Sequence, residues 1–462
     1  MPSNKPTLED AHKKIKEELN KLIESHRIEH DVFYQALEEV LFSIAPLYLA
    51  DEKYAKHNII RRLANPDRII KFKVEWMNDK NEIRVNTGYR VQFNNSLGPY
   101  KGGLRFHPSV NEGILKFLGF EQILKNALTG LPIGGGKGGS DFDPKGKSDF
   151  EVMKFCTSFM RELHKYIGPR MDVPAGDIGV GAREIGYLFA EYKRITTTFD
   201  GVLTGKPLFF GGSLGRTEAT GYGVVYFTEA MLETEKKEGL EGKTCTVSGA
   251  GNVALYTIEK LYQQGAIPVT CTDSKGTIYD ARGVDLEYLK DLKFNRRGSL
   301  EEYVSKHPEA IYIPVSEYPE GGHAVWNIET YAAFPCSTQN ELTEIDAKNL
   351  IKNGCVSVTE GANMPSTPEA METLLTNKVC FGPAKAANAG GVAVSNFEMS
   401  QNASMLKWTF EEVDAKLKTT MYDICQNIAD TAKEYGVEGN YVDGANIAGF
   451  KKVADVMIAE GI

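Results

Sequence analysis

Apolar residues at helical spacing mark the first segment of the chain. From Thr7 to about Arg27, apolar side chains recur every three or four positions, which is the pattern of one face of an α-helix. These residues are Leu8, Ala11, Ile15, Leu19, Leu22 and Ile23. The pattern predicts an amphipathic helix that lies on the surface or takes part in assembly.

Two stretches further along the chain alternate between apolar and polar residues. Residues 70–76 and 83–93 carry an apolar or aromatic side chain at almost every second position, which is the period of a half-buried β-strand. The apolar residues are Ile70, Phe72, Val74, Trp76, Ile83, Val85, Tyr89, Val91 and Phe93. Residues 78–81, Asn-Asp-Lys-Asn, are typical of a turn. We therefore expect a β-hairpin with one buried face.

The second half of the chain alternates short apolar runs with helical patterns. The first run, 244–248, is followed by a helical pattern from Asn252 and then by a second run at 268–272. Further candidate strands are 310–314, 332–335, 355–359 and 379–383. Alternation of this kind predicts a parallel sheet covered by helices.

Length and glycine content divide the chain. A chain of 462 residues exceeds the size of one compact core, so two domains are expected. The glycine-rich stretch from Gly205 to Gly223 indicates a boundary and a hinge. We expect an α/β fold of two domains separated by a cleft. Residues 1–205 would form an N-terminal α/β domain, and residues 206–435 a Rossmann-type dinucleotide-binding domain.

Composition argues against several classes of function. The formal net charge of −9 argues against nucleic acid as the main partner. No apolar run is long enough to span a membrane, and the N-terminus lacks the pattern of a signal or transit peptide, so we expect a cytoplasmic location. The seven cysteines include no Cys-x-x-Cys pair, and the eight histidines show no metal-ligand spacing. We expect reduced thiols and no metal site.

Three lysines are the strongest functional signal in the sequence. Lys101 and Lys137 stand in the glycine-rich segments 98–103 and 134–139, where a ligand can approach closely, and Lys125 stands in a helical pattern. Clustered cations in one cleft would bind a small, doubly charged anion. A lysine beside other cations can also have its pKa lowered and act as a base. The alternative is three separate solvated lysines.

A dinucleotide-binding pattern follows the first strand of the second half. The strand at 244–248 leads into Gly249-Ala250-Gly251-Asn252-Val253-Ala254, and a helical pattern follows. Glycines allow the tight turn and the close approach of a pyrophosphate, and the helix N-terminus attracts its charge. The alternative is an ordinary strand–helix turn.

The residues after the second strand bear on the choice of dinucleotide. Asp273 stands at the distance of an acid that binds the ribose diol, which favours NAD. Ser274 and Lys275 follow at once, and a basic cluster lies shortly downstream at Lys293, Arg296 and Arg297. A hydroxyl and cations suit a 2′-phosphate, so we expect NADP rather than NAD. The alternative for the cluster is a solvated helix end.

An aspartate in a Pro/Gly-rich loop is a further candidate. Asp177 lies in the segment 172–181, Asp-Val-Pro-Ala-Gly-Asp-Ile-Gly-Val-Gly. Functional acids are often found in loops. The alternative is an aspartate that caps the helix predicted from about Ala182.

Together these segments resemble the hexameric glutamate dehydrogenases of the small-subunit type, within the Glu/Leu/Phe/Val dehydrogenase family. The resemblance covers nearly the whole chain. It includes the segments 98–108, 117–125, 131–144, 173–183, 211–223, 249–254, 336–341, 360–365 and 385–400. It implies the reversible oxidative deamination of L-glutamate to 2-oxoglutarate and ammonium by hydride transfer. It also implies a homohexamer, with residues 1–205 binding substrate and residues 436–462 packing back onto that domain.

The resemblance implies substrate contacts for particular residues. Lys101 and Ser395 would bind the γ-carboxylate of glutamate. Lys125 and Gln122, which share a helical face, would bind the α-carboxylate. The backbone at Gly176 would also contact the substrate.

Catalytic and cofactor roles are implied in the same way. Lys137 would activate the attacking water, Asp177 would pass protons to and from the amino nitrogen, and Asn388 would lie near the nicotinamide and the substrate. The cofactor would contact Thr220, Gly249, Gly251, Asn252, Val253, Asp273, Ser274, Lys293, Arg296, Gln339 and Asn363. The segments around Ser248 and Asp273 resemble the NADP-dependent members, although Ser299 stands where an arginine would be expected.

Two other functions stay open at this point. One is an amino acid dehydrogenase acting on leucine, phenylalanine or valine, against which Lys101 and Ser395 argue. The other is a non-catalytic NADP-binding or scaffold protein, against which Lys137 and Asp177 argue.

Overall fold

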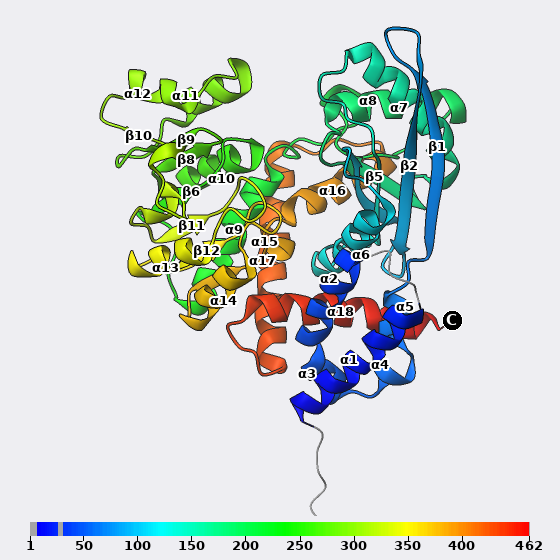
Figure 1. The fold of residues 1–462 in the computed structure, drawn as a ribbon, viewed down its shortest axis with the longest axis horizontal. Helices are drawn as coiled ribbons and strands as arrows, with labels where there is room; N and C mark the ends of the chain where they lie inside the picture. Colours follow the sequence, from blue (N-terminus) through cyan, green and yellow to red (C-terminus); the bar gives the residue numbers. More distant parts are fainter. Residues whose placement is uncertain (1–6, 26–30, 462) are drawn as a thin grey trace, which may run out of the picture. The chain divides into compact units, whose positions relative to one another are not determined.

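The structure is a computed structural model and describes residues 7–25 and 31–461. The chain forms two compact units (Figure 1). Unit 1 comprises Met1–Leu214, Val392–Val413 and Asn446–Ile462, and unit 2 comprises Gly215–Gly391 and Asp414–Ala445. The sequence prediction placed residues 392–413 in the second domain, whereas they belong to unit 1. Ser395 therefore lies in the same unit as Lys101.

The first helix, α1 (Leu8–Ser25), confirms the predicted amphipathic pattern. Three of the predicted apolar residues are buried: Ala11, Ile15 and Leu19. Leu8 is exposed instead, because it is the first residue of the helix. The side chains of Leu22 and Ile23, and the whole of Arg27, lie outside the described residues.

Unit 1 is built on a five-stranded sheet in the order β1-β2-β4-β3-β5. The strands are β1 (Arg68–Met77), β2 (Ile83–Asn94), β3 (Tyr100–Phe106), β4 (Gly135–Ser140) and β5 (Asp172–Gly176). Strand β2 is antiparallel to β1 and to β4, whereas β3 is parallel to β4 and to β5. The helices are α1, α2 (Asp31–Ser43), α3 (Ala45–Ala50), α4 (Lys53–Lys56), α5 (Ile59–Leu63), α6 (Glu112–Leu128), α7 (Asp149–Leu163) and α8 (Ala182–Thr196). Three further helices are each divided between the two units: α16 (Gly390–Ser404), α17 (Phe410–Glu434) and α18 (Tyr441–Glu460).

The predicted hairpin is confirmed as β1 and β2, the long blue strands of Figure 1. Its turn is closed by Asn78, whose Oδ1 accepts hydrogen bonds from the backbone N–H groups of Lys80 at 3.0 Å and Glu82 at 2.9 Å. The expectation of one buried face was wrong near the turn. Ile83 and Val85 are 62% and 60% exposed, because the end of the hairpin extends beyond the core beneath it.

An aromatic core supports the sheet of unit 1. Helix α7 begins at a capping box of Ser148 and Glu151, which satisfies backbone N–H groups of its first turn. Phe155 on this helix stacks on Phe142 at 3.8 Å between ring centroids and meets Phe106 of β3 edge-on at 5.1 Å. All three rings are buried, so they fix the distance between helix and sheet.

Unit 2 contains a parallel five-stranded sheet in the order β13-β12-β11-β6-β7. The strands are β6 (Thr244–Val247), β7 (Ile267–Pro268), β11 (Ala332–Phe334), β12 (Ser357–Thr359) and β13 (Cys380–Gly382). The helices are α9 (Ala219–Glu235), α10 (Asn252–Gln263), α11 (Leu286–Lys290), α12 (Tyr303–Lys306), α13 (Glu344–Lys352), α14 (Pro368–Thr376) and α15 (Ala384–Ala387). This alternation confirms the predicted α/β class.

Two runs predicted as parallel strands of unit 2 do not lie wholly in the parallel sheet. The run 268–272 is divided, because only β7 joins the parallel sheet, while β8 (Thr270–Asp273) turns back on β9 (Gly276–Tyr279) through Ser274 and Lys275. The run 310–314 contains β10 (Ile311–Pro314), which is antiparallel to β9. The tight turn after Asp273 therefore creates a separate antiparallel sheet, in the order β10-β9-β8.

Cysteines, possible metal ligands and apolar helices were considered in the sequence, and the structure describes each of them. The seven cysteines are buried free thiols. Across residues 7–25 and 31–461, no group of three or more His, Cys, Asp or Glu side chains is arranged to hold a metal ion. None of the helices in those ranges is both long enough and apolar enough to cross a membrane.

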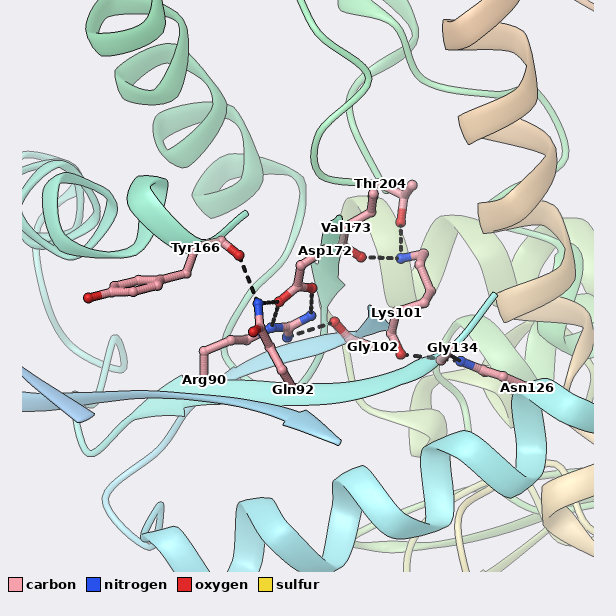
Figure 2. A network of polar contacts seen from close by, with 10 residues as sticks. All are labelled: Arg90, Gln92, Lys101, Gly102, Asn126, Gly134, Tyr166, Asp172, Val173 and Thr204. Carbon is pink, nitrogen blue, oxygen red and sulfur yellow. Dashed lines mark hydrogen bonds and ion pairs between the residues drawn. The ribbon is translucent and has the colours of Figure 1, made fainter. Parts of the chain in front are cut away.

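A fully buried ion pair crosses the sheet of unit 1 (Figure 2). The Nε of Arg90 on β2 donates to Oδ2 of Asp172 at 2.9 Å, and its second guanidinium nitrogen bonds Oδ1 of the same carboxylate. Arg90 also donates to the carbonyl of Gly102 on β3 at 3.2 Å. Gln92 adds a hydrogen bond to Asp172 at 3.1 Å. The guanidinium thus ties β2 to β3 and β5.

Glycine in the intervening strand β4 makes room for this side chain. A Cβ atom at Gly138 would lie 3.0 Å from Cδ of Arg90 and 2.8 Å from the backbone oxygen of Tyr89. The glycine-rich sequence around Lys137 is therefore a packing requirement as well as a functional signal.

Replacing Asp172 with Asn should destabilise unit 1 by about 3–5 kcal/mol, because a buried guanidinium loses its counter-charge. The measurement is the thermal unfolding midpoint of the D172N variant. The matched control is Glu75→Gln, which breaks the exposed Lys73–Glu75 pair and should change stability by less than about 1 kcal/mol. Equal midpoints for the two variants would contradict the role assigned to the buried pair.

Candidate active site

Strand pairing places three cations on one face of the unit 1 sheet. Arg105 on β3 is paired with Gly139 on β4 in parallel register. Because side chains alternate along each strand, Lys101, four residues before Arg105, and Lys137, two residues before Gly139, point to the same face as Arg105. Asp177 follows the end of β5 directly.

A triad of one buried and two partly buried side chains joins this face to the loop after β5. The carboxylate of Asp177 accepts a hydrogen bond from Nε of Arg105 at 2.7 Å and forms an ion pair with Nζ of Lys137 at 3.3 Å. The side chains of Arg105 and Asp177 are each 17% exposed, and that of Lys137 is 8% exposed. Gly103 leaves the space for Asp177, because a Cβ there would lie 2.8 Å from Cβ of Asp177.

The surroundings of the triad lower the pKa of both Lys137 and Asp177. Burial lowers the pKa of Lys137, the neighbouring carboxylate of Asp177 opposes this, and the cations Arg105 and Arg90 lower it further. For Asp177, burial favours the neutral acid, but Lys137 and Arg105 outweigh burial and hold its pKa below the usual value. The pair therefore combines an amine that loses its proton more readily than usual with a carboxylate that stays ionised.

Lys101 is held from two directions (Figure 2). Its ammonium donates to the carbonyl oxygen of Val173 at 3.0 Å and to Oγ1 of Thr204 at 2.8 Å. The residue is 1% exposed, so its position is set by these buried acceptors. Asn126 on α6 donates to the carbonyl of Lys101 at 3.2 Å and to that of Gly134 at 2.6 Å.

Helix α6 carries two more of the predicted substrate residues. Gln122 donates to Oδ1 of Asn126 at 2.7 Å, so its side chain belongs to the same network as Lys101. Lys125 lies in the last turn of this helix and is half-buried. Ser395 is 2% exposed on α16. Of the predicted substrate and catalytic residues, unit 1 contains all except Asn388.

The predicted dinucleotide turn lies at the start of α10 in unit 2. Gly249 has φ +91, and its N–H donates to Oγ1 of Thr272 at 2.7 Å. Gly251 is extended and precedes Asn252, the first residue of the helix, and no atom would lie within 4 Å of a Cβ on Gly251. The space beside Gly251 and the positive end of α10 fit a phosphate group.

The predicted ribose acid is already paired with a cation. Oδ2 of Asp273 accepts a hydrogen bond from Nζ of Lys293 at 2.9 Å, and its Oδ1 accepts one from the N–H of Lys275 at 2.9 Å. Arg296 faces two other carboxylates instead, those of Asp291 at 2.8 Å and Glu302 at 3.2 Å. Lys293 is thus the cluster member that lies against the ribose acid.

The predicted substrate residue Asn388 contacts the predicted cofactor residue Asn363. Asn388 donates to Oδ1 of Asn363 at 2.9 Å. Glu360 anchors the same loop, because its buried carboxylate accepts hydrogen bonds from the N–H groups of Ser366 at 3.2 Å and Ala384 at 2.8 Å. Burial raises the pKa of Glu360 to about 7.

The remaining predicted cofactor residues lie on other segments of unit 2. Thr220 is in the first turn of α9, where its Oγ1 would lie 2.6 Å from a Cβ atom on Gly391. Gln339 is exposed in the loop after β11. Val253 follows Asn252 in the first turn of α10, and Ser274 lies in the turn between β8 and β9.

Sequence reasoning missed three residues of the unit 1 site: Arg105, Thr204 and Arg90. Arg105 stands four residues after Lys101, and in a strand this spacing puts both side chains on one face. That signal was available in the sequence. The contacts of Thr204 and Arg90 depend on segments far apart in the chain, so no local pattern indicates them.

Comparison with known proteins identifies the family. The model described as Glutamate/Leucine/Phenylalanine/Valine dehydrogenase matches residues 211–461. The model described as Glu/Leu/Phe/Val dehydrogenase, dimerisation domain, matches residues 66–194.

Individual relatives agree over most of the chain. The chain is 59% identical over 430 residues to an NADP-specific glutamate dehydrogenase of Helicobacter pylori, covering 93% of this chain and 96% of that protein. It is 54% identical over 433 residues to an NAD(P)-specific glutamate dehydrogenase of Xylanibacter ruminicola, covering 93% and 96%. A crystal structure of Plasmodium falciparum glutamate dehydrogenase superposes with a TM-score of 0.92 at 48% identity, covering 98% of this chain and 95% of that one. The chain therefore belongs to the Glu/Leu/Phe/Val dehydrogenase family.

Proposed function

We propose that this chain catalyses the reversible oxidative deamination of L-glutamate to 2-oxoglutarate and ammonia with NADP(H). The observation that carries the proposal is the buried Lys137–Asp177 pair, which lies beside a sheet face that also presents Lys101 and Arg105. A strongly cationic face suits an amino acid with two carboxylates. Membership of the dehydrogenase family supplies the reaction class.

Each carboxylate of the substrate has its own binding residues in the proposal. Lys101 and Ser395 bind the γ-carboxylate, and Lys125 and Gln122 bind the α-carboxylate, with the backbone of Gly176 nearby. Two fixed carboxylates leave the α-carbon little freedom to move, and positioning of this kind can lower a barrier by ~7–11 kcal/mol. An apolar amino acid brings no second carboxylate to the ammonium of Lys101, so leucine, phenylalanine and valine should be poorer substrates than glutamate.

Two members of the triad, Lys137 and Asp177, perform the proton transfers. NADP⁺, when bound, supplies the hydride acceptor. After the α-carbon of glutamate loses its hydride, the substrate is an iminoglutarate. Neutral Lys137 takes a proton from a water as that water adds to the imine carbon. Asp177, which takes a proton from the substrate ammonium before the hydride leaves, returns that proton to the amino nitrogen of the water adduct. The C–N bond then breaks, the hydroxyl proton of the adduct passes to the Asp177 carboxylate, and ammonia leaves 2-oxoglutarate behind.

The arrangement around Asp273 supports NADP. Asp273 is neutralised by Lys293 and bonded by the Lys275 N–H, which makes it a weak acceptor for the hydroxyls of NAD. Ser274 follows it in an exposed turn, so a 2′-phosphate would meet a hydroxyl and cations there. Gly249, Gly251, Asn252 and Val253 would then contact the pyrophosphate. Asn363, Thr220 and Gln339 would contact the rest of the cofactor, and Asn388 would lie near the nicotinamide and the substrate.

Assembly and location complete the proposal. We propose a homohexamer in the cytoplasm, with residues 66–194 contributing to contacts between subunits. The exposed apolar residues Ile83 and Val85 at the end of the β1–β2 hairpin support a partner surface within that range.

The direct test of the proposed function is an absorbance assay of NADPH oxidation with 2-oxoglutarate and ammonium. The protein should oxidise NADPH, and kcat/KM with NADH should be lower by about tenfold or more, because the Lys293 side chain lacks a phosphate partner in NADH. Omitting ammonium is the control. Absence of oxidation would contradict the function, and equal use of NADH would contradict only the cofactor assignment.

Replacing Lys137 with Ala should lower kcat by about 10²–10⁴-fold while the KM for L-glutamate changes little, because the general base is lost and the carboxylate sites stay intact. In the wild-type enzyme, kcat should rise with pH through the lowered pKa of Lys137, since only the neutral amine accepts a proton. That rise should disappear in the K137A variant. Lys145→Ala, at an exposed lysine in the following loop, is the matched control. A K137A variant that differs only in KM would refute the assigned role.

A further inference from the structure

A second buried ion pair is formed by Lys206, two residues after the Thr204 that accepts a hydrogen bond from Lys101. The ammonium of Lys206 lies 2.8 Å from Oε1 of Glu398 on α16, and the two side chains are 1% and 0% exposed. Glu398 also accepts hydrogen bonds from the backbone N–H groups of Gly205 at 2.8 Å and Lys206 at 3.3 Å. Its carboxylate therefore contacts both the Lys206 side chain and the backbone of the short turn at residues 203–206.

The turn at residues 203–206 contains two residues with positive φ angles. Leu203 has φ +63 and Gly205 has φ +83, so two of its residues are left-handed. Leucine rarely adopts this conformation, and it persists only where the surroundings impose it. Leu203 is fully buried, and its carbonyl accepts a hydrogen bond from the Lys206 ammonium. The ion pair thus stabilises the turn, because Lys206 contacts its carbonyl at Leu203 and Glu398 contacts its N–H groups at Gly205 and Lys206.

Thr204, at the centre of this turn, contacts the proposed substrate site. Its Oγ1 accepts a hydrogen bond from Nζ of Lys101 at 2.8 Å, and its backbone N–H donates to the carbonyl of Pro174 at 2.9 Å. Figure 2 shows the threonine hydroxyl and the carbonyl of Val173 meeting the same ammonium. Any shift of the turn would therefore move an acceptor of Lys101.

The other end of the ion pair belongs to the helix of Ser395. Ser395 lies three residues before Glu398 on α16, which is about one helical turn. The pair therefore joins the segment that orients Lys101 to the helix that carries Ser395. These are the two residues assigned to the γ-carboxylate of the substrate.

We propose that Glu398 and Lys206 are positioning residues for the γ-carboxylate pocket, setting the distance between Lys101 and Ser395 through the turn at Thr204. The inference rests on the proposed function, because it concerns the same pocket. A merely structural pair would affect stability and leave substrate selectivity unchanged. A positioning pair must affect the KM for glutamate and the preference for glutamate over an apolar amino acid of the same length.

The test compares E398Q, T204V and the double variant with L-glutamate and with L-norvaline, which lacks the γ-carboxylate. E398Q should raise the KM for glutamate by about tenfold with a smaller change in kcat, because a hydrogen bond to a charged group is misplaced. Its preference for glutamate over norvaline should fall by a similar factor. In the T204V background, E398Q should add less than about twofold, because both changes act through one turn.

Gln401→Leu is the matched control. Gln401 lies on the same helix, is also buried, and ties it to the same segment through a hydrogen bond to Oγ of Ser213 at 2.7 Å, away from Thr204. This variant should lower the unfolding midpoint and leave selectivity at the wild-type value.

Several results would overturn the inference. A folded E398Q enzyme with wild-type KM and selectivity would do so, as would independent, multiplicative effects of E398Q and T204V. T204V leaves the ion pair intact, so unchanged selectivity in that variant would also refute the inference even if E398Q did not fold. Wild-type protein without activity on glutamate would refute the proposed function itself, which is a different outcome.

Discussion

The buried Arg90–Asp172 ion pair is the constraint on which the rest of unit 1 depends. The charge of a buried guanidinium must be compensated by the protein, because water does not reach it. The hydrogen bonds of Arg90 therefore hold β2, β3 and β5 in one register. The same side chain crosses β4, and glycine is required there for steric reasons. Asp172 begins β5, and Asp177 follows the end of that strand. The position of the triad is therefore a consequence of the sheet.

The charges of the two units are arranged differently. In unit 1, the carboxylate of Asp177 is paired with two cations, Arg105 and Lys137. In unit 2, Asp273 is neutralised one-to-one by Lys293, so a nearby phosphate meets no net negative charge. In both arrangements a partly buried carboxylate lies beside a counter-charge, which offsets the cost of removing the carboxylate from water.

Much of this could be predicted from local sequence patterns. Strand alternation gave the β1–β2 hairpin, and the Gly249–Ala254 segment gave the turn before α10, because both depend on neighbours in the chain. The errors came from non-local packing. The run 310–314 looked like a buried parallel strand, but the turn after Asp273 redirects it into an antiparallel sheet. Helix α16 was assigned to the second domain because it follows that domain in sequence, whereas Glu398 fixes most of it to unit 1. Arg105 could have been found from its spacing to Lys101, whereas Thr204 could not.

The central claim is that the site binds two carboxylates at once, one at Lys101 and one at Lys125. The most direct measurement is inhibition of glutamate oxidation by glutarate and by pentanoate, which have the same chain length but two carboxylates and one carboxylate respectively. The account predicts that glutarate competes with L-glutamate and has an inhibition constant at least about tenfold below that of pentanoate, because it alone supplies a counter-charge to each lysine site. Equal inhibition constants, or inhibition that L-glutamate does not relieve, would contradict it.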